Sequence, residues 1–164
     1  MLDELGNKLL EYIRENNPDV LFQLEQEAGL TQYLNLKLSE AADLIEKLKK
    51  KRRPGYLIEK ICLDQMTADL RPSKYNYIRT VLSEEFEKEY SQMVEAGLLQ
   101  YEVINMVTYC LPIFQDLRFS EETADNRFTR YAIAGMISEY LVSNSVNEKV
   151  NDGLQQSAKA QGQY

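Results

Sequence analysis

The densest group of chemically capable residues in this chain is cationic. Lysine stands at position 47, and cations fill the run Lys49, Lys50, Lys51, Arg52 and Arg53. Such a cluster would bind phosphate in a nucleic acid, or an acidic protein partner. Five consecutive residues spread around a helix instead of forming a stripe. The cluster therefore also suits a solvated helix end, where cations face the negative end of the helix dipole.

A second group places cations beside aromatic rings. Its candidate binding residues are Arg71, Lys74, Tyr77 and Arg79. Tyrosine stacking along a cationic path is a way in which proteins hold single-stranded nucleic acid. The neighbouring residues allow another interpretation, because Ser73 suits a helix N-cap and Tyr75 fits an apolar helical stripe. Both interpretations stay open at this point.

Catalytic and metal-binding chemistry finds little support, because the chain contains no histidine. Histidine is the commonest general base and metal ligand. The acidic group around Glu84 and Glu85 lacks the spacing of a calcium loop, and the two cysteines, Cys62 and Cys110, lie among apolar neighbours. We therefore expect buried thiols, no catalytic residue, no metal and no cofactor. An enzyme with a carboxylate metal site is the third-ranked alternative.

The elements that position these groups are predicted to be helices. Apolar residues recur at three- and four-residue intervals along most of the chain, and no alternating strand pattern is present. Turn signals separate the stripes at Pro18, Pro54-Gly55, Pro72 and Gly97. Ser120 resembles a helix start, and Pro112 predicts a kink or a break near Cys110. The pattern predicts an all-α, single-domain bundle of about six helices.

The segment from Phe128 to Val142 is apolar on almost every side. A helix of that kind is normally buried, so we expect it at the centre of the bundle, with Gly135 allowing a neighbour to approach closely. The chain then becomes polar. We expect a helical domain over residues 1–146 and a disordered tail over residues 147–164.

Net charge and hydropathy restrict the partners. The chain carries a net charge of −7, which disfavours general attraction to nucleic acid or anionic lipid but allows a local basic site. No stretch is apolar enough to span a membrane, and the first residues, with Asp3 and Glu4, do not resemble a signal peptide. We expect a cytoplasmic protein with no membrane partner.

Several local patterns resemble one known family. Near the start is the helix end at Asn16-Asn17-Pro18-Asp19, and in the middle the stretch Leu70 to Tyr75 is followed by Thr80 to Phe86. Later come two short patterns, at Leu111 to Phe114 and at Phe119 to Glu122, and then the helix Tyr131 to Tyr140. Together they resemble an uncharacterised all-helical Bacteroidetes domain family that is often found near mobile-element genes. The segment 36–53 is more basic than the Ala-rich second helix of that family. The resemblance implies a helical fold in a bacterial cytoplasm and no known activity.

The first-ranked functional hypothesis is a non-enzymatic binding or accessory protein. It would use a helical surface, with tyrosine anchors, on an unidentified protein partner or on a second copy of itself. The alternative is a nucleic-acid-associated factor of a mobile element that uses the two basic groups.

Overall fold

The structure is a computed structural model that describes the backbone of residues 1–161 and the side chains of residues 1–145. Every regular element in that part is helical. The elements are α1 (Leu2–Asn16), α2 (Pro18–Gln26), α3 (Leu30–Lys50), α4 (Gly55–Met66), the 3-10 turn η1 (Ala68–Leu70), α5 (Lys74–Glu85), α6 (Glu87–Glu95), α7 (Leu99–Asp116) and α8 (Arg127–Gln161). The all-α bundle is confirmed, with eight α-helices in the described chain instead of about six.

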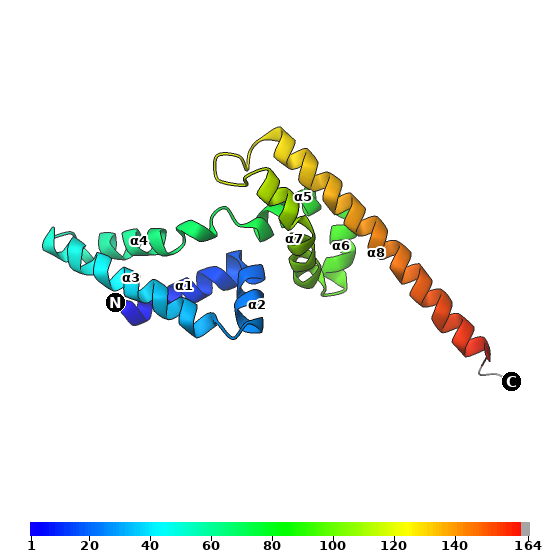
Figure 1. Cartoon of the computed structure of the whole chain (residues 1–164), viewed down its shortest axis with the longest axis horizontal. Helices are drawn as coiled ribbons and strands as arrows, with labels where there is room; N and C mark the ends of the chain where they lie inside the picture. Colours follow the sequence, from blue (N-terminus) through cyan, green and yellow to red (C-terminus); the bar gives the residue numbers. More distant parts are fainter. Residues whose placement is uncertain (162–164) are drawn as a thin grey trace.

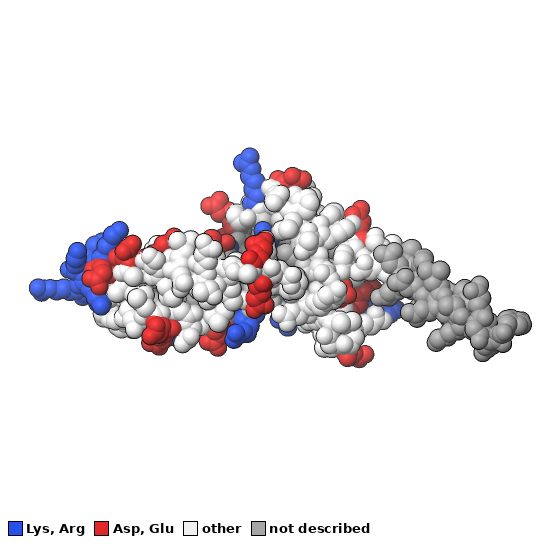
Figure 2. Space-filling view, turned by 60° about the horizontal axis from the view of Figure 1, so that its bottom comes forward, with Lys and Arg blue, Asp and Glu red and all other residues white. Residues whose placement is uncertain are grey.

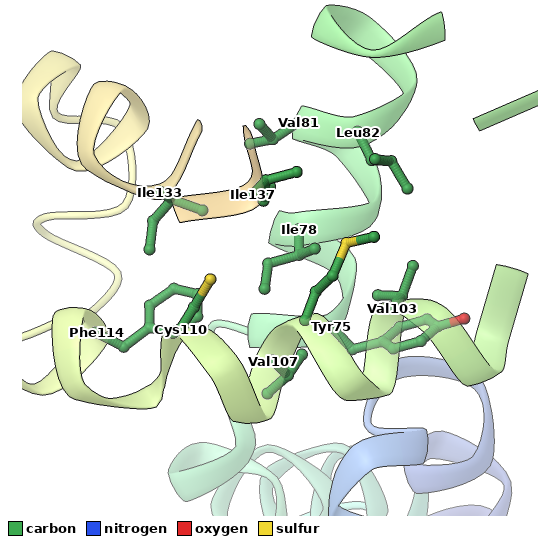
Figure 3. Close-up of a cluster of buried hydrophobic side chains, with 11 residues drawn as sticks. Tyr75, Ile78, Val81, Leu82, Val103, Val107, Cys110, Phe114, Ile133 and Ile137 are labelled. Carbon is green, nitrogen blue, oxygen red and sulfur yellow. The ribbon is translucent and has the colours of Figure 1, made fainter. Parts of the chain in front are cut away.

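The helices form two halves, each around its own apolar core (Figure 1). In the first half, α1 and α4 contribute the fully buried Leu5, Leu9 and Cys62, and α3 adds the buried Ile45 and Leu48. In the second half, α8 packs against α5 and α7. Figure 3 shows Ile133 and Ile137 of α8 on the same cluster as Ile78 of α5 and Phe114 of α7.

A polar junction joins the two halves beside the contact of α2 with α7. The Asn76 side chain of α5 donates to the Asn16 side-chain oxygen at 3.1 Å, and next to it, within the first half, the Asn17 side chain donates to the Leu70 carbonyl oxygen, also at 3.1 Å. The Ser73 hydroxyl donates to the Asn16 carbonyl oxygen. The same hydroxyl accepts from the Asn76 N–H at 3.0 Å, so Ser73 caps α5 as predicted and also holds the halves together.

Several helix ends could not be read from the sequence pattern. Apolar residues recur at helical spacing from Tyr75 to Met93, but this segment is divided into two helices at Phe86, whose φ of −132° is not helical. Ser120 starts a hydrogen-bonded turn with Thr123, and α8 begins only at Arg127. Of the two outcomes predicted for Pro112, a kink or a break near Cys110, the break does not occur, because α7 continues through Pro112 to Asp116.

The prediction that Phe128 to Val142 forms a buried central helix is wrong. Only one side of this part of α8 is buried, at Thr129, Ile133 and Ile137. Phe128 and Val142 on the other side are exposed. Nothing lies within 4 Å of a Cβ placed on Gly135, so no neighbour approaches closely there. The prediction took a helix that is apolar on almost every side to be covered on every side by the same chain, and this is not the case for α8.

The predicted disordered tail of residues 147–164 lies at the end of α8. The backbone is helical through Gln161, side chains beyond Ser145 lie outside the described residues, and so do residues 162–164 altogether. The tail therefore stays a prediction. Separately, none of the described helices has the length and apolar character needed to cross a membrane.

Candidate functional site

The first cationic group forms a projection that we call the basic tip, consisting of Lys47 and Lys49 through Arg53. It lies at the end of α3 and in the turn that leads to α4, at the far end of the molecule from the C-terminal end of α8 (Figure 1). The buried residues Ile45 and Leu48 anchor the end of α3 in the first core. The tip is thus attached to a rigid element although its charged side chains face solvent.

Backbone hydrogen bonds close the turn of the basic tip. The N–H groups of Lys51, Arg52 and Arg53 donate to the carbonyl oxygens of Lys47, Lys49 and Leu48, at 3.3, 2.9 and 3.2 Å. Arg52 has a φ of +53°, a left-handed conformation in which glycine usually ends a helix. The side chain at this position is therefore held on the outside of a compact turn.

All six cations of the basic tip are exposed. The ion pairs among the described side chains engage Lys8, Lys37, Arg71 and Arg130, and none engages the tip. Figure 2 shows the blue group at one end of the molecule, away from most red side chains. The segment 47–53 holds six of the chain's 19 cations and none of its 26 acids, so the rest of the chain has a net charge of −13.

An exposed aromatic ring adjoins the basic tip. Tyr56 lies in the first turn of α4 and is 79% exposed. The carbonyl oxygen of Pro54 accepts from the N–H groups of Leu57 and Ile58, which fixes the start of this helix. A tyrosine held beside cations supplies a flat face for a base or an aromatic group. Tyr56 was not among the predicted binding residues, although its position two residues after Pro54, beside the cationic run, could have indicated an exposed ring at a turn.

The second basic group does not come together as one surface. Arg71 donates to the Asp64 carbonyl oxygen at 3.1 Å and lies 3.6 Å from a Glu121 carboxylate oxygen. The Lys74 ammonium lies 5.9 Å from the centre of the Phe114 ring. These two cations are therefore occupied by contacts within the chain.

Tyr77, the aromatic member of that group, and the neighbouring Tyr75 both pack against other side chains of the chain. Tyr77 packs edge-on against Phe119 with ring centres 5.1 Å apart, and Tyr75 is buried in the second core. Burial raises the pKa of the Tyr77 hydroxyl, which the nearby Arg130 opposes. Arg79 alone of the four candidate residues is exposed without an ion pair among the described side chains.

The acidic group provides ion pairs instead of a metal site. Arg130 of α8 lies 2.7 Å from a Glu84 carboxylate oxygen and 3.4 Å from one of Glu85. Among the described residues, no three cysteine, aspartate or glutamate side chains lie close enough together to hold a metal ion. Glu84 and Glu85 therefore stabilise the packing of α8 against α5.

Sequence reasoning missed a cleft at the junction of the two halves. Its volume is about 640 Å³, and its lining includes Tyr12 of α1, Tyr77 of α5, and Arg127 and Tyr131 of α8. These residues come from segments that are far apart in the sequence, so spacing along the chain gives no signal of the cleft. The cleft is open to solvent, and Arg130 in its wall is already paired with Glu84 and Glu85.

The two cysteines are buried and unpaired, as predicted. Burial raises the pKa of Cys110 to about 11 and raises that of Cys62. Because the thiolate is the nucleophilic form, neither environment activates its cysteine.

Comparison with protein-family models, with curated proteins and with solved structures finds no match to this chain. The resemblance to the Bacteroidetes family therefore stays a prediction. Within the described residues, the basic tip is the most densely cationic surface, with six cations in seven consecutive positions.

Proposed function

We propose that the protein is a non-enzymatic binding protein that docks on the phosphate backbone of a nucleic acid through its basic tip. The observation that carries this proposal is the group of six exposed cations, unpaired among the described side chains, at one end of an otherwise acidic molecule. The proposal follows the second-ranked hypothesis, a nucleic-acid-associated factor, and limits the contact to the first of the two basic groups.

Electrostatics favours the tip as the single point of contact. Each phosphate that a lysine or arginine neutralises releases condensed counterions, which drives binding without reading sequence. The rest of the chain, with its net charge of −13, is repelled by the same backbone. Approach is therefore oriented with the tip forward, and the exposed ring of Tyr56 can stack on an unpaired base.

The number of phosphate contacts predicts how steeply the affinity falls with salt concentration. With as many as six phosphate contacts, the affinity falls with a log–log slope of roughly −5, or about 10³-fold between 50 and 200 mM salt. An acidic protein partner would present fewer and less regular charges than a duplex. Its binding would fall less steeply with salt.

The test uses reversal of charge at two places with equal net charge. One variant carries Lys49→Glu, Lys50→Glu and Lys51→Glu, and the matched control carries Arg79→Glu, Lys88→Glu and Arg118→Glu, which are exposed cations elsewhere. Binding to a labelled duplex of about 20 base pairs is followed by fluorescence anisotropy across a salt series. The tip variant is expected to lose most of its affinity and about three units of slope, and the control to lose less.

Two results would contradict the proposal. Equal loss in both variants would mean that net charge alone, and not the tip, governs binding. A wild-type protein that binds neither single- nor double-stranded DNA nor RNA at low salt would exclude a nucleic acid as the partner. Circular dichroism of both variants checks that each remains helical.

A further inference from the structure

The outward face of α8 is an apolar stripe that the described part of the chain leaves uncovered. Phe128, Tyr131 and Val142 are 77%, 62% and 62% exposed, and Gly135 lies between them. Their spacing of three, four and seven residues places all four on the side of the helix opposite the buried Ile133. We call these four residues the outer stripe.

The structure assigns the outer stripe as a self-association surface: we propose that two copies of this chain pair through it with their α8 helices antiparallel. Large exposed apolar groups in line on one helix mark an interaction site more strongly than single exposed residues do. This proposal concerns a different surface from the basic tip and does not depend on nucleic-acid binding.

The order of residues along the outer stripe favours a second copy as the occupant. Phe128 lies seven residues before Gly135, and Val142 lies seven residues after it. A two-fold axis at Gly135 therefore places each Phe128 opposite the smaller Val142 of the other copy. It also places Tyr131 opposite Glu139, whose carboxylate accepts from the Tyr109 hydroxyl at 3.3 Å within the chain and has capacity for a second hydrogen bond from a tyrosine hydroxyl.

A parallel arrangement fits the outer stripe less well. It would set Phe128 against Phe128 and Tyr131 against Tyr131, whereas the antiparallel arrangement sets each ring against a different side chain. Gly135 meets its counterpart in either arrangement, and its small size lets two helices approach closely. A Cβ at Gly135 would meet nothing within 4 Å in the single chain, so the space above it is open.

The buried area predicts the strength of pairing. At about 200 Å² per ring, the exposed fractions of Phe128 and Tyr131 amount to roughly 280 Å² per copy. A standard stable interface buries about 800 Å² per partner, so the two rings supply roughly a third of that area before Val142 and the flanking residues are added. This is the size of a weak interface, and we expect a micromolar dissociation constant.

Electrostatics gives this pairing a distinctive salt dependence. Each copy carries a net charge of −7, so two copies repel at long range. The four residues of the outer stripe carry no charge, and the exposed Glu139 lies beside them. Added salt screens the repulsion and is expected to strengthen pairing, which is the opposite of its effect on phosphate binding.

The experiment compares two tyrosines of nearly equal exposure in protein free of nucleic acid. Tyr131→Glu changes the outer stripe, and Tyr101→Glu changes a tyrosine on α7 that is 63% exposed. Sedimentation equilibrium from about 5 to 500 µM is expected to give a rising average mass for wild type and for Tyr101→Glu. Tyr131→Glu is expected to stay monomeric, with at least a tenfold weaker association.

Three outcomes would overturn the proposal. The first is a wild-type protein that stays monomeric over the whole concentration range. The second is association that Tyr131→Glu leaves unchanged. The third is equal loss in both variants. Thermal melting of each variant shows that a change in mass does not reflect unfolding.

The antiparallel arrangement has its own test. Chains carrying Phe128→Cys are mixed with chains carrying Val142→Cys under mild oxidation, while the native Cys62 and Cys110 are buried and unavailable. The mixed disulfide between positions 128 and 142 is expected to exceed the 128–128 product. A predominant 128–128 product would show parallel pairing and contradict the assigned geometry.

Discussion

At the scale of single residues, burial sets the chemistry of Cys110. This thiol is fully buried on α7 among the apolar side chains of the second core, and burial raises its pKa from 9.0 to about 11. The folded state therefore holds the thiol proton more tightly than the unfolded state does. Stability from this residue is fully present below pH 9 and is lost as the pH rises from about 9 towards 11.

Replacing Cys110 by alanine is expected to make the protein less sensitive to alkaline pH. Between pH 8 and 10, the wild type should lose roughly 1 kcal/mol of unfolding free energy through this thiol, because the unfolded chain deprotonates first. Urea denaturation at several pH values measures the slope. Val107→Ala, also buried on α7, makes a cavity but keeps the thiol and should retain the wild-type slope. Equal slopes for wild type and Cys110→Ala would contradict the assigned effect of burial.

At the scale of elements, the start of α5 connects local and long-range structure. Ser73 accepts a hydrogen bond from the Asn76 N–H at 3.0 Å and donates to the Asn16 carbonyl oxygen of α1. Ser73→Ala removes both the helix cap and one hydrogen bond across the junction. We expect a loss of about 1–2 kcal/mol in unfolding free energy, since an N-cap alone contributes about 1 kcal/mol.

A second serine of α5 serves as the control for this prediction. The Ser83 hydroxyl donates only to the Thr80 carbonyl oxygen, within the same helix, and Ser83→Ala should cost less than about 0.5 kcal/mol. Chemical denaturation of both variants gives the comparison. Similar costs for the two substitutions would mean that the Ser73 cap and junction contribute little to stability.

Much of the helical architecture could be predicted from local signals. The cap at Ser73, the first-turn position of Pro18 and the end of α3 in a cationic run all depend on neighbouring residues, which the sequence displays directly. The break at Phe86 could not be foreseen in this way. Its non-helical φ interrupts an apolar pattern that continues on both sides, so α6 is set by packing across the second half.

For the candidate binding residues, too, what neighbouring residues determine could be predicted, and what distant segments determine could not. The exposure of Lys49 through Arg53 could be expected at a helix end, because it needs no knowledge of distant segments. The contacts that occupy Arg71 and Lys74 involve Glu121 and Phe114, which are about 40 to 50 positions away in the sequence. The exposed side of α8 was missed for another reason: the sequence shows that a face is apolar but not whether the folded chain covers it.

At the scale of the whole molecule, the two proposed binding surfaces lie in different halves. The basic tip ends the first half, and the outer stripe lies on the last helix of the second half (Figure 1). If the two proposals hold together, a pair of copies carries two tips. A paired molecule can then engage one long nucleic acid twice, which raises its effective affinity without any new contact.

This bivalence predicts a dependence on nucleic-acid length. On a duplex that accommodates only one tip, wild type and Tyr131→Glu should bind equally, because the substitution leaves the tip intact. On a duplex several times longer, wild type should bind about 10- to 100-fold more tightly than Tyr131→Glu at concentrations where wild type is paired. Anisotropy titrations with the two lengths test this difference at a single salt concentration. An equal advantage on both lengths would mean that Tyr131 contacts the nucleic acid itself, and no advantage on either would mean that the tips act singly.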